Sequence, residues 1–208
     1  EDLIVRVPMG TLIKDFETDK VIARSYNKFF NIEERPETEW RNLQQNLQFP
    51  VQVYLKENGF LGIVSYNPKT DDLFIASKST NQGEYAGYFK ELLLKELGDN
   101  VNHFKDFLRL MNVSAIFEVI DIVNDPHIIK YNESGVFLLD VVKNDFTNTF
   151  MDYGALELFA EEFNFETKTL IKTCENFEAL KEFIDYYDDS MNGVPIEGFV
   201  VKDSKGFM

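Results

Sequence analysis

The order of strand-like and helix-like segments is the feature that most constrains the fold of this chain. Runs of β-branched and aromatic residues separated by turn residues fill most of the first 77 positions, and two segments with helical spacing follow. Two strands, a helix, a strand, a helix and a final strand complete the order. Doubly wound folds need regular alternation of strands and helices, which is missing here. The sequence therefore predicts an α+β fold with largely antiparallel sheets flanked by helices.

The expected elements follow from hydrophobic period and turn residues. Residues 58–59, Asn-Gly, lie between two strand-like runs and are a strong signal for a β-hairpin. The expected strands cover residues 3–13, 20–26, 51–56, 60–66, 73–77, 115–122, 135–142, 170–173 and 196–202. The expected helices cover residues 37–47, 84–97, 101–111, 153–163 and 177–187. Neither a G-x-G-x-x-G nor a Walker loop is present, so the common phosphate-binding loops are excluded.

Composition limits the class of protein. A chain of 208 residues suits one domain, or one domain and part of a second, and a 44% hydrophobic content can form a core. Cys174 is the only cysteine and there are two histidines, so disulfide frameworks and Cys- or His-rich metal sites are excluded. No apolar run approaches the roughly 18 residues of a membrane span, and no secretion leader is seen. We therefore expect a cytoplasmic protein.

The net charge of −15 is unfavourable for binding nucleic acid, because nucleic-acid binders usually carry a positive field. An acidic chain can still contain a local basic cleft, since the field depends on where the charges lie. We expect this chain alone to bind nucleic acid weakly.

Lys56 is the first candidate for chemistry. It lies where an expected strand meets Glu57, Asn58 and Gly59, and the missing side chain of Gly59 leaves backbone uncovered beside it. A lysine is a nucleophile only when neutral, so such a site must lower its pKa by burial or through neighbouring cations. Taken alone, the tetrapeptide fits a solvated lysine leading into a hairpin better than it fits a catalytic lysine.

Two carboxylates are associated with apolar strands. If residues alternate along the expected strand, Glu118 shares a face with Ile116 and Ile120, and a carboxylate there needs a partner such as a hydroxyl, a lysine or a metal. An edge strand with Glu118 at its rim is the alternative. Glu197 opens a second apolar strand, and Gly198 follows it; an exposed strand start is again the alternative.

Residues 24–31 bring two cations, Arg24 and Lys28, together with three aromatic residues. The cations can hold phosphates, and an aromatic ring such as that of Phe30 can stack on a base. A strand end with core phenylalanines is the alternative.

The order of these elements resembles that of the covalent nucleotidyltransferases, the superfamily of DNA ligases, RNA ligases and capping enzymes. The motif Tyr-Asn-Lys-Phe-Phe-Asn at residues 26–31 resembles the one in the phage RNA ligase 1 family and its relatives. These relatives include the ligase domain of fungal tRNA ligase. Residues 77–78 resemble the next element after the nucleophile. Residues 128–140, with Tyr131, are similar to the segment that follows the first glutamate.

The resemblance implies a nucleotidyltransferase domain over residues 1–208 that acts as an ATP-dependent RNA ligase. Lys56 would take up AMP, which passes to an RNA 5′-phosphate before a 3′-hydroxyl attacks. A magnesium or manganese ion held by Glu118 and Glu197 would neutralise charge. The implied nucleotide-binding residues are Arg6, Arg24, Lys28, Phe30, Gly59, Lys78, Glu118 and Glu197.

The chain departs from the family in two places. Met9 stands where an arginine is expected, and Arg6 is a possible substitute. The chain stops at Met208, before the lysine pair that binds the triphosphate. We expect the domain to be truncated at both ends, with a lysine pair and a C-terminal RNA-binding domain beyond it. A GTP-dependent capping enzyme and a non-catalytic binding domain of the same fold remain alternatives.

Overall fold

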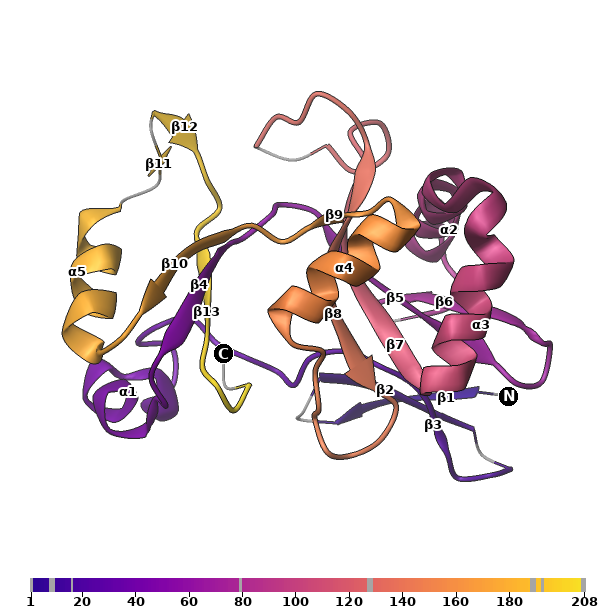
Figure 1. Ribbon diagram of the computed structural model, residues 1–208, viewed down its shortest axis with the longest axis horizontal. Helices are drawn as coiled ribbons and strands as arrows, with labels where there is room; N and C mark the ends of the chain where they lie inside the picture. Colours follow the sequence, from indigo (N-terminus) through magenta and orange to yellow (C-terminus); the bar gives the residue numbers. More distant parts are fainter. Residues whose placement is uncertain are drawn as a thin grey trace. The chain divides into compact units, whose positions relative to one another are not determined.

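The computed structural model describes residues 2–7, 10–15, 17–78, 80–126, 129–187, 190–191 and 193–206, with side chains from Leu12 onward (Figure 1). The chain divides into two compact units, each built from two separate stretches. Unit 1 comprises Glu1–Asn27 and Asn58–Thr167, and unit 2 comprises Lys28–Glu57 and Lys168–Met208. Mixed helices and mostly antiparallel strands confirm the α+β prediction.

Unit 1 is centred on a five-stranded sheet in the order β6-β5-β7-β8-β9. Its neighbouring strands are antiparallel except β8 and β9, which are parallel. The strands are β5 (Phe60–Asn67), β6 (Asp72–Ser77), β7 (Val113–Ile120), β8 (Gly135–Lys143) and β9 (Glu166–Thr167). The central position of β7 gives it a hydrogen-bonded neighbour on each side.

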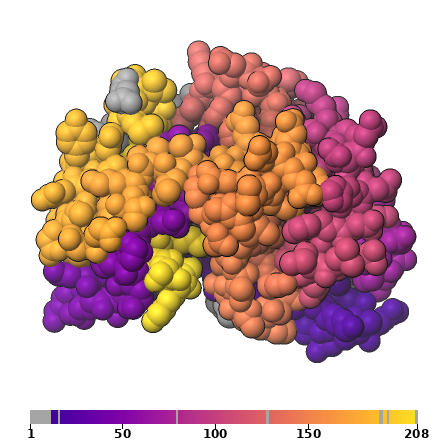
Figure 2. Space-filling view, viewed as in Figure 1, coloured from indigo at the N-terminus to yellow at the C-terminus, as the bar shows by residue number. Residues whose placement is uncertain are grey.

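The helices α2 (Glu84–Leu97), α3 (Val101–Met111) and α4 (Tyr153–Phe163) contribute to the main core of unit 1. Phenylalanine side chains dominate this core, and Phe117 of β7 packs among them. In the space-filling view α3 and α4 lie side by side on the surface (Figure 2). Phe107 of α3 meets Phe159 of α4 with 4.8 Å between the ring centroids. Part of the high phenylalanine content therefore serves to join these helices to the sheet.

A second sheet of unit 1, in the order β1-β2-β3, packs on the five-stranded sheet through a separate small core. Its antiparallel strands are β1 (Asp2–Val7), β2 (Gly10–Asp15) and β3 (Val21–Arg24). Ile13, Ile22 and Ala23 meet apolar side chains of β5 and β6. The single strand expected over residues 3–13 is wrong, because Val7 pairs with Gly10 and the chain reverses there. Pro8 has no backbone N–H for a strand ladder, which favours a break at this point.

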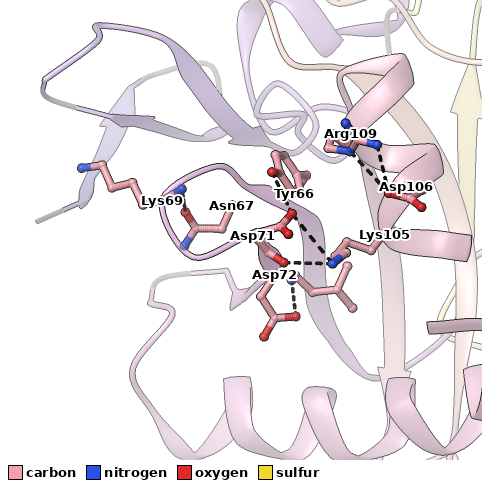
Figure 3. Close-up of polar contacts among 9 residues, drawn as sticks. Tyr66, Asn67, Lys69, Asp71, Asp72, Lys105, Asp106 and Arg109 are labelled. Carbon is pink, nitrogen blue, oxygen red and sulfur yellow. Dashed lines mark hydrogen bonds and ion pairs between the residues drawn. The ribbon is translucent and has the colours of Figure 1, made fainter. Parts of the chain in front are cut away.

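The turn between β5 and β6 is fixed by polar contacts with α3 (Figure 3). Lys105 of α3 donates a hydrogen bond to the backbone oxygen of Asp71 at 2.9 Å, and the Tyr66 hydroxyl donates to the Asp71 carboxylate at 3.0 Å. Lys69 in the same turn pairs with the buried Asp15 at 2.9 Å. The Lys69 ammonium holds the pKa of the Asp15 carboxyl below its usual value. The contact therefore ties the turn to the end of β2.

Unit 2 contains a three-stranded antiparallel sheet in the order β10-β4-β13. Its strands are β4 (Val51–Leu55), β10 (Leu170–Cys174) and β13 (Phe199–Lys202), and β11 (Ser190–Met191) pairs with β12 (Val194–Pro195) apart from them. The short η1 (Pro36–Thr38) leads into α1 (Trp40–Asn46), and α5 (Phe177–Tyr186) follows β10. Leu43 of α1 and Phe183 of α5 pack with Val51 and Val53 of β4 in one cluster.

The hairpin expected around Asn58 and Gly59 is wrong. β4 and β5 belong to different sheets and to different units, so the chain passes from one sheet to another where a tight turn was expected. The backbone N–H groups of Asn58 and Gly59 donate to side chains that lie far away in sequence, and β4 finds its partners in β10 and β13. An Asn-Gly pair indicates a local turn, but it does not determine whether the two flanking strands pair with each other.

Candidate functional site

Lys56 immediately follows β4, and strand pairing in unit 2 determines its surroundings. Leu55 pairs with Phe199 of β13, and the Lys56 backbone N–H donates to the Gly198 oxygen at 3.0 Å. The Lys56 ammonium forms an ion pair with the Glu197 carboxylate, which is 141 residues away in sequence. These side chains are 37% and 32% exposed, so the pair is open to solvent and can exchange partners. Two of the predicted site residues are thus in direct contact.

Glu118 lies in the central strand β7, so the edge-strand alternative is wrong. The expected alternation is confirmed: Phe117 and Val119 belong to the main core, whereas Ile116 and Ile120 are buried outside it. One Glu118 carboxylate oxygen accepts a hydrogen bond from the Gly59 backbone N–H at 3.0 Å. Because of this contact, the carboxylate is held at the start of β5.

Gly59 has a packing reason to be glycine in addition to the predicted approach of a nucleotide. A Cβ atom at Gly59 would lie 2.2 Å from the backbone oxygen of Val119 and 2.8 Å from the Ile120 side chain. Backbone of a central strand cannot move away cheaply, so any larger residue must displace β5 from β7.

Gly59→Ala is expected to lower the free energy of unfolding by more than about 2 kcal/mol, because overpacking against backbone is costly. Gly87→Ala is the matched control, since a Cβ at this exposed position of α2 meets nothing within 4 Å. That control should raise the free energy of unfolding by about 0.5–1 kcal/mol through helix propensity. Urea denaturation of both variants makes the comparison, and equal stability of the two would contradict it.

Asn58 adds a feature that sequence reasoning missed. Its backbone N–H donates to the Tyr131 hydroxyl oxygen at 2.8 Å. Its side-chain oxygen, Oδ1, is buried and has no hydrogen-bond partner, and no other side-chain atom in the described ranges shares this state. An unpartnered buried oxygen costs roughly 1–3 kcal/mol. The Lys-x-Asn-Gly spacing pointed to Lys56 and Gly59 as site residues and gave no reason to single out Asn58.

Arg24 is buried inside unit 1. Its guanidinium donates to the Asp145 backbone oxygen at 2.6 Å and to the side-chain oxygens of Asn27 and Asn148 at 3.1 and 2.9 Å. Burial lowers the pKa of the Arg24 guanidinium, and the nearby Asp145 carboxylate partly opposes this effect. The predicted phosphate-binding side chain is therefore engaged in joining β3 to the loop after β8.

Tyr26, at the start of the predicted 26–31 motif, is also held internally. Its hydroxyl donates to the buried Asp140 carboxylate at 2.6 Å, and its ring stacks on Phe150 with 5.6 Å between centroids. The first residue of the motif therefore serves as an anchor in unit 1.

Lys28 and Phe30 of the same motif lie in unit 2. The Lys28 ammonium is 4.9 Å from the centroid of the Phe30 ring, and the Arg35 guanidinium is 5.1 Å from it. Phe30 is half-buried and Phe29 is 40% exposed, so neither is the core phenylalanine of the alternative reading. Two exposed cations therefore lie at one ring; Lys28 was predicted from the sequence, and Arg35 was not.

The remaining candidates are less informative. Lys78 follows β6 in unit 1 and is exposed. Arg6 is in β1, but its side chain is outside the described part, and Met9 lies outside the described residues altogether. Lys168, which sequence reasoning missed, is buried in unit 2 with its ammonium 4.3 Å from the Tyr54 ring centroid. No sequence signal distinguished it from other lysines.

Glu118 and Glu197 were predicted as the ligands of a metal ion. Among the residues that the structure describes, no group of three or more His, Cys, Asp or Glu side chains is arranged to hold a metal ion. Magnesium is commonly held through one or two carboxylates together with substrate phosphates, so a single carboxylate, of Glu118 in unit 1 or of Glu197 in unit 2, is a suitable donor without such a group. Separately, no helix within the described ranges is long and apolar enough to cross a membrane.

On this α+β scaffold, a lysine at a strand end is paired with a carboxylate that precedes the neighbouring strand. The sequence matches the family model described as RNA ligase over residues 10–208. The chain therefore belongs to this RNA ligase family, the phage RNA ligase 1 family that the motifs predicted.

Curated relatives of similar sequence are fungal tRNA ligases. The chain is 27% identical to tRNA ligase of Candida albicans over 218 residues, which covers 88% of this chain and 25% of the relative. It is 27% identical to tRNA ligase 1 of Schizosaccharomyces pombe over 205 residues, covering 90% and 26%. The chain thus spans about a quarter of the length of these relatives.

Solved structures share the fold. A mutant RNA ligase of Naegleria gruberi with ATP and Mn superimposes with a TM-score of 0.66 at 13% identity, covering 100% of this chain and 60% of the other. An archaeal ATP-dependent RNA ligase gives a TM-score of 0.63 at 17% identity, covering 99% and 55%. These likenesses confirm the predicted nucleotidyltransferase fold.

Proposed function

We propose that this chain is the nucleotidyltransferase domain of an ATP-dependent RNA ligase and that Lys56 is its site of AMP attachment. The observation that carries the proposal is the Lys56–Glu197 pair at adjoining strand ends, in a chain of the RNA ligase family. Structures of relatives with ATP and Mn and the fungal tRNA ligases support ATP as the nucleotide and RNA as the substrate. In this proposal the enzyme joins an RNA end that carries a 5′-phosphate to one that carries a 3′-hydroxyl.

Features of unit 1 fit a bound nucleotide. The buried Oδ1 of Asn58 lacks a partner, and a donor group of a ligand or its hydration shell would satisfy it. The Glu118 carboxylate accepts the Gly59 N–H at 3.0 Å, and we assign it to a ribose hydroxyl or to the metal, as the resemblance implies. Asn58 lies two residues after Lys56 in the chain. Glu118 is hydrogen-bonded to Gly59, which lies three residues after Lys56.

The reaction begins when neutral Lys56 attacks the α-phosphorus of ATP. A phosphorus–nitrogen bond forms, the bond to the bridging oxygen breaks, and pyrophosphate leaves. Because the amine attacks only when neutral, the ion pair with Glu197 must open and the ammonium must lose a proton first. The AMP then passes to an RNA 5′-phosphate, and attack by a 3′-hydroxyl seals the strand and releases AMP.

Charge neutralisation supplies most of the remaining catalysis in such phosphoryl chemistry. We assign fixed positive charge to Lys28 and Lys78, as the resemblance implies. A magnesium or manganese ion, held through Glu118 and Glu197, would supply further neutralisation of the phosphates. Arg35, beside Lys28 on the Phe30 ring, adds a cation to this set.

Charge is distributed unequally between the units. Unit 1 carries 12 Lys and Arg against 23 Asp and Glu, a net charge of −11, whereas unit 2 carries nine against 13, a net charge of −4. RNA affinity depends strongly on basic groups that contact phosphates. We therefore infer that a further RNA-binding domain contributes to RNA binding by the whole protein.

Incubation of the full-length protein with labelled ATP or GTP and Mg²⁺ or Mn²⁺, followed by a denaturing gel and peptide mass spectrometry, tests the function. We expect label from ATP only, attached to Lys56. Label from GTP only would favour a capping-type enzyme, and absence of label from both would favour a non-catalytic binding domain.

Lys28→Ala and Glu197→Ala are expected to slow formation of lysyl-AMP by about 10²-fold, because each removes a charge used in the transition state. Both side chains are solvent-accessible, so the free energy of unfolding should change by less than about 1 kcal/mol. Glu182→Ala, at an exposed position of α5, is a control for loss of a surface carboxylate. A variant that melts early but adenylylates at the normal rate would show that its residue is structural.

A further inference from the structure

The connection between Lys56 and β5 is held by two side chains from elsewhere in unit 1. We propose that Tyr131 is a positioning residue, which together with Glu118 clamps the backbone that follows Lys56. The inference rests on the proposed function, because the clamp matters for catalysis only if Lys56 is the nucleophile. Tyr131 lies within residues 128–140, the segment that resembles the family, and has no role assigned by that resemblance.

The clamp consists of hydrogen bonds to two consecutive backbone N–H groups. The Asn58 N–H donates to the Tyr131 hydroxyl oxygen at 2.8 Å, and the Gly59 N–H donates to a Glu118 carboxylate oxygen at 3.0 Å. Both residues precede the first residue of β5, so these N–H groups are not part of its strand ladder. Fixing the two groups restricts the backbone dihedral angles of the segment that joins Lys56 to β5.

Tyr131 is well placed to act as a fixed acceptor. It lies in the connection between β7 and β8, is half-buried, and its ring packs near Phe137 of β8 with 6.5 Å between centroids. The start of this connection has ties of its own, since the Asp121 carboxylate accepts from the Val123 and Asn124 N–H groups. Removing the Tyr131 hydroxyl should therefore release Asn58 without unfolding the connection.

Fixing this backbone has a direct consequence for a nucleophile two residues earlier in the chain. Reaction rates depend steeply on the position of the attacking atom, and a misplacement of about 1 Å can cost on the order of 10²-fold. Loss of positioning lowers the maximum rate more than it weakens binding of the nucleotide. A merely structural tyrosine would instead lower stability and leave the rate of the folded protein unchanged.

Tyr131→Phe in the full-length protein tests the clamp with two measurements. Hydrogen exchange, followed by mass spectrometry on peptides that contain Asn58, reports the hydrogen bond itself. Single-turnover formation of lysyl-AMP at varied ATP concentration reports positioning. Tyr186→Phe is the matched control, because Tyr186 is 80% exposed and its hydroxyl makes no hydrogen bond among the described residues. Both are assayed well below their melting temperatures.

We expect faster exchange at Asn58 in Tyr131→Phe, a maximum rate lower by about 10- to 100-fold, and an apparent ATP affinity within about twofold of the parent. The control should match the parent in every measurement. Unchanged exchange at Asn58 would overturn the hydrogen bond, and faster exchange with a normal maximum rate would overturn the positioning role. If the parent protein itself takes up no AMP, the proposed function fails and the positioning role falls with it, whatever the exchange result.

Discussion

Lys56→Ala is expected to abolish labelling with AMP, with a loss on the order of 10³-fold or more, because removing a nucleophile leaves only the uncatalysed background. The same change should alter the free energy of unfolding by less than about 1 kcal/mol, since exposed ion pairs contribute about 0–1 kcal/mol. The Lys56 side chain is 37% exposed and its partner Glu197 is 32% exposed, so neither becomes a buried unpaired charge. Labelling with ATP and thermal melting measure the two effects separately.

Lys56→Arg sharpens this test, because it keeps a positive charge for Glu197 but removes the amine that attacks phosphorus. We expect it to be as inactive as Lys56→Ala and to melt like the parent. Lys172→Ala, an exposed lysine of the neighbouring strand β10, is the control and should label normally. Mass spectrometry that located AMP on Lys28 or Lys78, with Lys56 unmodified, would refute the assignment.

Arg24→Ala is expected to lower the free energy of unfolding by about 3–5 kcal/mol, as loss of one member of a buried charged network does. The guanidinium ties Asn27 to Asn148 and Asp145, and its removal leaves these acceptors without their donor. Arg24→Lys should recover little of the loss, because an ammonium cannot reproduce the planar set of donors. Chemical denaturation measures the change.

The Arg24 experiment also separates a structural role from the phosphate-binding role that the resemblance implied. Arg109→Ala is the control, because Arg109 is 46% exposed and its ion pair among the described residues is with Asp106 of the same helix. If Arg24 is structural, Arg24→Ala should melt early. The free energy of unfolding of Arg109→Ala should change by less than about 0.5 kcal/mol. If Arg24→Ala melts like the parent but binds ATP weakly, the phosphate-binding role is correct instead.

The sequence by itself determined the elements whose stability is local. The expected helices at residues 84–97, 101–111 and 153–163 agree with α2, α3 and α4, because apolar spacing and capping residues such as Asp152 and Asn164 lie within or beside each helix. The sequence also predicted the α+β class, the alternation that places Glu118 away from the main core, and the family, whose motifs are short and ordered along the chain.

Only the tertiary structure decided which distant segments meet. A strand's hydrogen-bond partners come from another segment, so the pattern within residues 51–66 could not reveal that β4 pairs with β10 and β13 instead of β5. The same pairing brings Glu197 to Lys56, and packing between β3 and the loop after β8 buries Arg24. Residue type fixed which groups can react or carry charge, whereas long-range strand pairing and burial determined which of them are free to do so.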